Sequence, residues 1–174
     1  QFNKIIRNHK ISAVMMEVSR NYQPKNNFLK KIRKITKKKN ITLIFDECTS
    51  GFRQTFGGLH KLYRVNPDMA IFGKSLGNGY PITAIIGNKK VMKYSQSSFI
   101  SSTFWSEKSG YVAALKTLEV MRKKKSWKQI TKKGKHIRKK WKNLGKKYDL
   151  GIEITGIPAI SIFKFKSKNS KKYI

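Results

Sequence analysis

The chain has 174 residues, of which 39% are hydrophobic and 11% aromatic, enough for one globular domain with a sizeable core. Its formal net charge is +32, because 40 basic residues face only eight acidic ones. Cys48 is the single cysteine, which excludes an internal disulfide and a multi-thiolate zinc site, and no apolar run is long enough to span a bilayer. We therefore predict a cytoplasmic protein with no metal site and no membrane segment.

The excess of positive charge makes nucleic acid an alternative partner, because lysine and arginine release counterions from phosphates. However, 33 of the 40 basic residues are lysine and only seven are arginine. Proteins that recognise the bases and phosphates of nucleic acids favour arginine, because its planar guanidinium forms bidentate hydrogen bonds. Lysine, asparagine and isoleucine share A/T-rich codons, so a biased genome also explains this composition. We favour an enzyme without a nucleic-acid partner and keep a basic nucleic-acid-binding domain as the outside alternative.

The first part of the chain predicts a strand, a helix and a second strand. Residues 11–18 form a compact apolar run typical of a buried strand, and residues 27–39 carry apolar side chains at helical spacing. Residues 41–45 are continuous, apolar and rich in β-branched side chains. This order predicts a βαβ unit with parallel strands and a right-handed crossover.

The remainder predicts two more strands, two long helices and a hairpin. The strands are expected at 68–72 and 82–87, and the helices at 105–123 and 127–148. From Gly151 the pattern alternates between apolar and polar residues, which predicts an antiparallel hairpin turning near residues 156–158. We therefore expect a domain boundary near residue 148. The helical lysines lie mostly between apolar positions, which favours a solvated face over a phosphate-binding stripe.

Two chemically active side chains follow neighbouring strands. Asp46 comes directly after the most hydrophobic strand, and Lys74 follows the strand 68–72, with glycines at 73, 77 and 79. In open α/β sheets this edge is where ligands bind, although Asp46 alone is also typical of a turn cap. If the ligand is pyridoxal phosphate, Asp46 can keep the pyridine nitrogen protonated while Lys74 holds the aldehyde as an imine. The pair is more specific than either residue alone.

Three segments carry a resemblance to a known family. They are Ile-Phe-Asp-Glu-Cys-Thr-Ser-Gly-Phe-Arg at 44–53, Asn-Pro-Asp-Met-Ala-Ile-Phe-Gly-Lys-Ser-Leu-Gly-Asn-Gly-Tyr-Pro-Ile at 66–82, and Ser-Thr-Phe-Trp-Ser at 102–106. In this order and spacing they resemble class III aminotransferases, particularly the glutamate-1-semialdehyde aminomutase-like branch. The resemblance implies the α/β fold-type I architecture, a mostly parallel sheet with helices on both faces, and a homodimer with shared active sites.

The resemblance also implies roles for individual residues. Lys74 would form the internal aldimine with pyridoxal phosphate and shuttle protons, and Asp46 would pair with the pyridine nitrogen. Thr103 would bind the cofactor phosphate of the neighbouring subunit. Cys48 stands where the family has an aliphatic residue against the cofactor ring, and a small thiol can fill that place or simply belong to the core.

The roles of several other polar residues are not determined by the resemblance. Glu17 lies at the end of the first expected strand, where the family commonly shows Glu-Pro, but Val18 replaces the proline. Glu17 either lines the site or does not, and both alternatives stay open. Arg53 matches a family arginine that either pairs with a carboxylate or binds substrate. The three histidines, at positions 9, 60 and 136, have no ligand-like spacing and predict surface or loop positions.

The function implied is amino transfer from a small-molecule amino donor to a carbonyl acceptor, through the Lys74 aldimine and a pyridoxamine intermediate. The alternative is a glutamate-1-semialdehyde 2,1-aminomutase, an isomerase that moves the amino group within one substrate. Family members are much longer, so we expect residues 1–147 to be part of the cofactor-binding large domain and 148–174 the truncated start of a small α+β domain. This segment alone is expected to bind pyridoxal phosphate weakly or not at all and to be inactive.

Overall fold

The computed structural model describes residues 2–103 and 105–166 of the chain. Phe104 of the 102–106 motif and the last part of the expected C-terminal domain, residues 167–174, lie outside the described residues. Within the described ranges, no helix combines the length and the apolar character that crossing a membrane requires.

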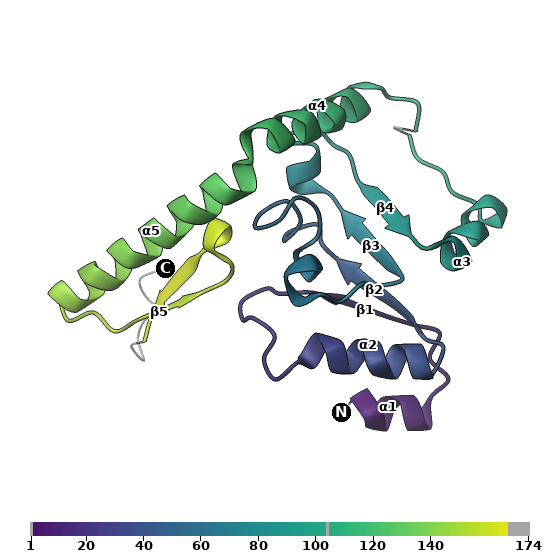
Figure 1. The fold of residues 1–174 in the computed structure, drawn as a ribbon, viewed down its shortest axis with the longest axis horizontal. Coiled ribbons are helices and arrows are strands. Elements are labelled where there is room, and N and C mark those ends of the chain that lie inside the picture. Colours follow the sequence, from purple (N-terminus) through teal and green to yellow (C-terminus); the bar gives the residue numbers. More distant parts are fainter. Residues whose placement is uncertain (1, 104, 167–174) are drawn as a thin grey trace.

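The centre of the fold is a four-stranded sheet with the order β1-β2-β3-β4 (Figure 1). Its strands are β1 (Ala13–Glu17), β2 (Thr42–Asp46), β3 (Met69–Phe72) and β4 (Ala84–Gly87). The first three strands run parallel, and β4 is antiparallel to β3. The α/β class, the mostly parallel sheet and all four expected strands are therefore confirmed.

Five α-helices accompany the sheet in the described residues: α1 (Phe2–Asn8), α2 (Phe28–Lys38), α3 (Lys89–Met92), α4 (Ser109–Lys124) and α5 (Ser126–Lys147). Short 3₁₀ helices occur at η1 (Leu59–Tyr63), η2 (Lys74–Leu76), η3 (Lys93–Ser97) and η4 (Pro158–Ile160). The three expected helices are confirmed as α2, α4 and α5, although α4 begins four residues later than predicted. The short helices α1 and α3 were not predicted.

The described core lies on one face of the sheet. Phe45 is opposite Ala70 in the β2–β3 register, so both point to the same side, and both are buried. Helix α2 packs against Phe45 through Leu29 and Ile32, and α4 contributes its buried Ala114 beside Ala70. The other face is more open here, with Met15 of β1 61% exposed and Ile85 of β4 52% exposed. Helices on that second face remain a prediction.

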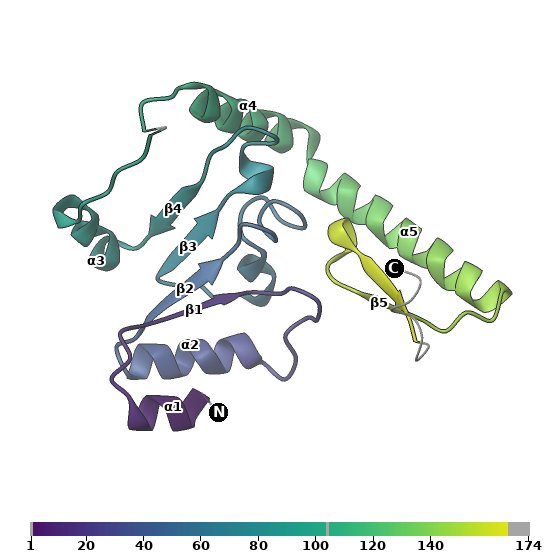
Figure 2. The ribbon, with the colours of Figure 1, turned by 180° about the vertical axis from the view of Figure 1, so that it is seen from behind.

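The C-terminal hairpin forms a separate two-stranded sheet. Strands β5 (Ile152–Thr155) and β6 (Ile162–Phe165) are antiparallel, as expected. Figures 1 and 2 show α5 extending away from the four-stranded sheet with β5 beside it. Helix α5 and η4 come very close at Gly134, where an added Cβ would lie 2.0 Å from the carbonyl oxygen of Pro158. Only glycine permits this approach.

The segment between β5 and β6 also contacts the main core. Ile157 is 1% exposed and belongs to the same apolar cluster as Val18 and Leu29, and the Gly156 amide donates a hydrogen bond to the carbonyl of Asn21 at 2.7 Å. The boundary near residue 148 thus separates two sheets but not two isolated cores, and it remains a prediction.

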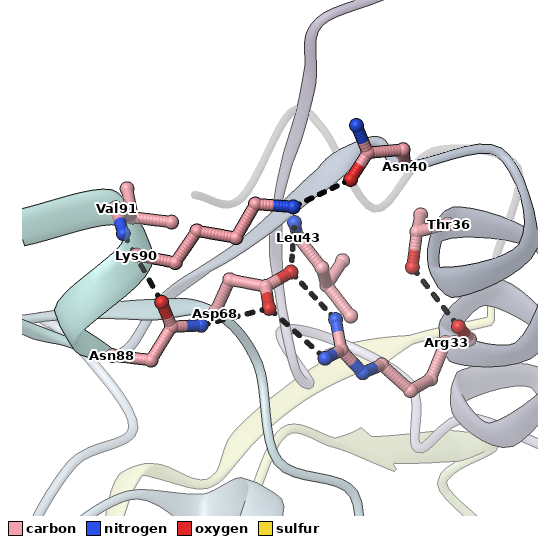
Figure 3. A network of polar contacts seen from close by, with 8 residues as sticks. All are labelled: Arg33, Thr36, Asn40, Leu43, Asp68, Asn88, Lys90 and Val91. Atoms are coloured by element: carbon pink, nitrogen blue, oxygen red, sulfur yellow. Dashed lines mark hydrogen bonds and ion pairs between the residues drawn. The ribbon is translucent and has the colours of Figure 1, made fainter.

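A half-buried ion pair stabilises the sheet at the amino end of β3. Arg33 of α2 donates from Nη1 and Nη2 to the two carboxylate oxygens of Asp68, at 2.6 and 2.9 Å (Figure 3). Asp68 also accepts hydrogen bonds from the amide of Leu43 and the side chain of Asn88. Burial opposes ionisation of this carboxyl, but these partners outweigh it and hold the pKa of Asp68 below its ordinary value.

A buried carboxylate fixes the opposite end of β2. Glu47 is 0% exposed, and it accepts hydrogen bonds from Ser50 Oγ and from the backbone amide and Nδ1 of His60. The Glu47 amide donates to the carbonyl of Ile71 in β3 at 2.8 Å. Burial would raise the pKa of Glu47, but the hydrogen bonds from His60 and Ser50 outweigh it and lower the pKa. The turn after β2 is therefore anchored to β3 and to η1.

The Arg33→Ala variant should lower the free energy of unfolding by about 2 kcal/mol, because it removes charge-assisted hydrogen bonds from a half-buried carboxylate. The matched variant Arg20→Ala removes an ion pair with Glu17 from an arginine that is 76% exposed, and it should cost less than about 1 kcal/mol. Urea denaturation measures both. Because the folded-state pKa of Asp68 is lowered, the Arg33 effect should be complete at neutral pH and shrink as the pH falls below about 4. Equal losses for the two arginines would contradict this assignment.

The Glu47→Gln variant should lower the free energy of unfolding by about 1–3 kcal/mol at pH 7, since the buried donors of His60 and Ser50 lose their charged acceptor. Glu119→Gln, on the exposed side of α4, is the control and should stay within about 0.5 kcal/mol of the parent. The contribution of Glu47 exists above the unfolded-state pKa of about 4.3 and disappears as the pH falls through the lowered folded-state pKa. The gap between the denaturation curves of the parent and of Glu47→Gln should therefore narrow as the pH falls from 7 through this range, and a gap that does not change with pH would rule out this ionisation.

Candidate active site

The carboxyl ends of the parallel strands meet at one edge of the sheet. Glu17 of β1 is opposite Asp46 of β2, which is in turn opposite Ile71 of β3. The chain leaves β3 through Gly73 directly into Lys74. The sheet therefore brings Asp46 and Lys74 to the same edge, where open α/β sheets bind ligands.

Lys74 is the most unusual residue at this edge. Its backbone has φ +45°, in the left-handed region, which costs a non-glycine residue on the order of 1–3 kcal/mol. Its Nζ donates a hydrogen bond to Thr49 Oγ1 at 2.7 Å. The side chain is otherwise exposed and borders two clefts, of about 690 and 770 Å³. A ligand in either cleft would have access to this amine.

Cys48 lies between Asp46 and the backbone that precedes Lys74. Its amide donates to Asp46 Oδ1 at 2.9 Å, and a Cβ added to Gly73 would lie 3.4 Å from Cys48 Sγ. Burial raises the pKa of the Cys48 thiol, the Asp46 carboxylate raises it further, and the Lys74 ammonium offsets part of the effect. The thiol is therefore protonated at neutral pH and acts as a small apolar side chain.

Thr103 lies apart from this group. It is exposed in the segment before α4, and it is not among the residues that line either cleft beside Lys74. Its neighbours Ser102 and Trp105 do line the smaller of these clefts. The structure thus brings Asp46, Cys48 and Lys74 together within one chain and leaves Thr103 outside their cluster.

Glu17 and Arg53 lie at the margins of the site. Glu17 is next to Asp46 in the sheet register, but its carboxylate pairs with Arg20 at 3.0 Å. Arg53 lines the larger cleft, and its Nε donates to the carbonyl of Thr49 at 3.4 Å. Among the described residues, Arg53 has no carboxylate partner, so its guanidinium faces the cleft without an ion pair.

The sequence did not predict two contacts near the end of β2, the one between Glu47 and His60 and the one between Thr49 and Lys74. The expectation of a surface position for His60 is wrong, because its side chain is buried against Glu47. No local pattern links these two residues, which lie 13 positions apart. Thr49 was also not singled out, although its place three residues after Asp46 puts it in the turn at the strand end. Within the ranges that the structure describes, no cluster of side chains could hold a metal ion.

Comparisons with known proteins agree with this geometry. The family model for class III aminotransferases matches residues 2–174. A 3-aminobutyryl-CoA aminotransferase from Cloacimonas acidaminovorans is 33% identical over 86% of this chain and 36% of its own length. A glutamate-1-semialdehyde 2,1-aminomutase from Methanosphaera stadtmanae is 33% identical over 82% of this chain and 34% of its own length. This chain thus spans about a third of the length of these relatives.

The fold is also that of solved structures. The FumI protein of Sphingopyxis sp. MTA144, in its PLP internal aldimine form, superposes with a TM-score of 0.91 at 22% identity, over 97% of this chain and 42% of that one. An S-selective transaminase from Arthrobacter sp. superposes with a TM-score of 0.80 at 26% identity, over 98% of this chain and 39% of that one. The sheet described above therefore has the fold-type I architecture of these PLP-dependent proteins. By the family match and the sequence identity to its relatives, the chain belongs to the class III aminotransferase family.

Proposed function

We propose that this chain carries the pyridoxal-phosphate site of an aminotransferase, with Lys74 as the lysine that bonds to the cofactor. The observation that carries the proposal is the meeting of Asp46 and Lys74 at the carboxyl edge of the sheet, in a member of this family. The donor set fits the cofactor. Pyridoxal phosphate presents an aldehyde, which an amine can bind, and a pyridine nitrogen, which a carboxylate can keep protonated.

Each residue of the cluster then has a distinct task. Lys74 would hold the aldehyde carbon, Asp46 the pyridine nitrogen, and Cys48 one face of the ring. Thr103, which lies outside the cluster, would hold the phosphate bound in a partner subunit, within a homodimer. The exposed apolar side chains of Phe99 (97%) and Trp105 (61%) near Thr103 support such an interface. When bound, the cofactor supplies an electron sink for negative charge at the carbon that carries the amino group.

The protein residues control protons around that chemistry. Asp46 is half-buried at the strand end, and its negative charge favours a proton on a nitrogen placed against it. Lys74 Nζ, once released from the cofactor, is the amine available to take a proton from the substrate carbon and return it to a neighbouring atom. The Cys48 thiol, held neutral, adds no competing nucleophile beside Lys74.

The reaction proposed is transfer of an amino group from a small-molecule donor to a carbonyl acceptor. Intramolecular transfer, as in the aminomutase relatives, is the second candidate. One of these relatives is 33% identical to this chain, the same identity as the aminotransferase relative, so identity supports both reactions equally. The two differ in one measurable respect. A transaminase needs a separate donor and acceptor and releases a new keto product, whereas an aminomutase converts glutamate-1-semialdehyde when this substrate is supplied alone.

We also propose that the protein is cytoplasmic and has no nucleic-acid partner.

Borohydride reduction of the whole protein with pyridoxal phosphate should fix the cofactor on the peptide that contains Lys74. In Lys74→Ala the adduct should disappear and kcat should fall by about 10²–10⁴-fold, as expected on losing a general acid and base. Lys34→Ala, which removes an exposed lysine of α2, should change neither property. Peptide mapping by mass spectrometry provides the readout, and an adduct on another lysine in the parent protein would overturn the assignment.

The Asp46→Asn variant should still attach the cofactor to Lys74 but should lower kcat by about tenfold or more, because a neutral amide no longer favours a proton on the pyridine nitrogen. The cofactor absorbance, followed as a function of pH, should show that the bound ring loses this proton at a lower pH than in the parent. Unchanged titration of the ring together with full activity would place the pyridine nitrogen elsewhere.

A further inference from the structure

We propose that Thr49 is a positioning residue that holds the Lys74 amine whenever this amine is not bonded to the cofactor. The inference rests on the proposed function for the role of the amine, but the contact itself is independent of it. Thr49 Oγ1 accepts a hydrogen bond from Lys74 Nζ at 2.7 Å, a distance typical of a well-formed bond.

The contact joins two segments that the sheet brings together. Thr49 lies in the turn after β2, and Lys74 lies directly after β3, 25 residues later in the sequence. Among the described residues, Thr49 Oγ1 accepts the hydrogen bond from Lys74 Nζ, and no carboxylate pairs with this amine. Lys74 also borders the two clefts. The hydroxyl of Thr49 therefore determines the position of the Lys74 amine when this amine is not bonded to a ligand.

Thr49 is itself held in place on both sides. Its carbonyl accepts from Arg53 Nε at 3.4 Å, and the Gly51 amide donates to the Glu47 carbonyl at 2.7 Å. A Cβ at Gly51 would lie 2.7 Å from that carbonyl oxygen, so the turn is closely packed. The carboxylate of Glu47 anchors the same turn in the core through His60. The hydroxyl of Thr49 is thus presented by a rigid support and not by a mobile loop.

The backbone conformation at Lys74 also restricts the direction in which its side chain can leave the chain. Its left-handed φ of +45° and the buried Gly73 against Cys48 direct the side chain across the end of β2. A lysine has several rotatable bonds, and holding its amine near the reaction centre removes the cost of finding that position in every cycle. The hydroxyl accepts a hydrogen bond without a charge of its own, so it can release the amine to the cofactor and receive it again.

The test compares Thr49→Val with Thr49→Ser. Valine keeps the branched shape of threonine but lacks the acceptor, and serine keeps the hydroxyl. Each whole protein, freed of pyridoxal phosphate, is treated with a limiting amount of N-hydroxysuccinimidyl acetate, and acetylation of every lysine is followed by mass spectrometry. In the valine variant, Lys74 should be acetylated about two- to tenfold faster than in the parent, which corresponds to the loss of one hydrogen bond, and serine should restore the parent rate.

Lys61 is the internal reference for local unfolding. Its Nζ donates to the carbonyl of Phe56 at 3.0 Å within the next turn, so damage to this region would also accelerate its acetylation. An unchanged rate at Lys61 together with a faster rate at Lys74 supports the inference. Parallel acceleration of both lysines in the valine variant, or an unchanged rate at Lys74, would overturn it.

A second measurement addresses the role of the contact. The rate at which the cofactor-free protein captures added pyridoxal phosphate, followed by absorbance, should fall about two- to tenfold in Thr49→Val and recover in Thr49→Ser, opposite in direction to acetylation. Capture at the parent rate in the valine variant would overturn the positioning role. Failure of the proposed function is distinguishable, because borohydride would then label a lysine other than Lys74 while the acetylation difference at Lys74 persisted.

Discussion

A carboxylate without access to water is tolerated only where hydrogen bonds and charges replace its hydration, and Glu47 meets this condition at the end of β2. Its amide donates a hydrogen bond to β3 and its side chain accepts hydrogen bonds from η1. These contacts fix the path of the backbone after β2. Asp46 precedes it, and Cys48 and Thr49 follow it. The residues that lie beside Lys74 are therefore positioned by a neighbouring residue whose own side chain is buried in the core.

In this arrangement, the residues that stabilise the fold are different from the residues that line the candidate site. The Arg33–Asp68 pair and the Glu47–His60 pair secure the two ends of the central strands, and neither borders the clefts beside Lys74. The face between them is left with half-buried and exposed side chains that can contact a ligand or further protein. Such a division is expected when a site must remain polar and accessible while its framework must not move.

The sequence predicted the sheet well because strands buried on at least one face leave short, continuous apolar runs, as at 41–45. It placed Asp46 and Lys74 at one edge because parallel strands share a direction. It could not predict the contact of Glu47 with His60, which depends on how η1 folds back. Nor could it show which apolar positions of α4 are covered: Ala114 is buried, but Leu115, which also follows the helical period, is 69% exposed. Periodicity identifies a face and not its partner.

The left-handed backbone at Lys74 has an evolutionary consequence. Glycine or asparagine would suit this conformation better than lysine, so local foldability and chemistry make opposite demands at this position. If Lys74 serves the proposed amino transfer, selection for that reaction would maintain the less stable choice. In a descendant that no longer needed the reaction, substitutions toward glycine would be favoured here first, while the buried turn beneath it would still be conserved for folding.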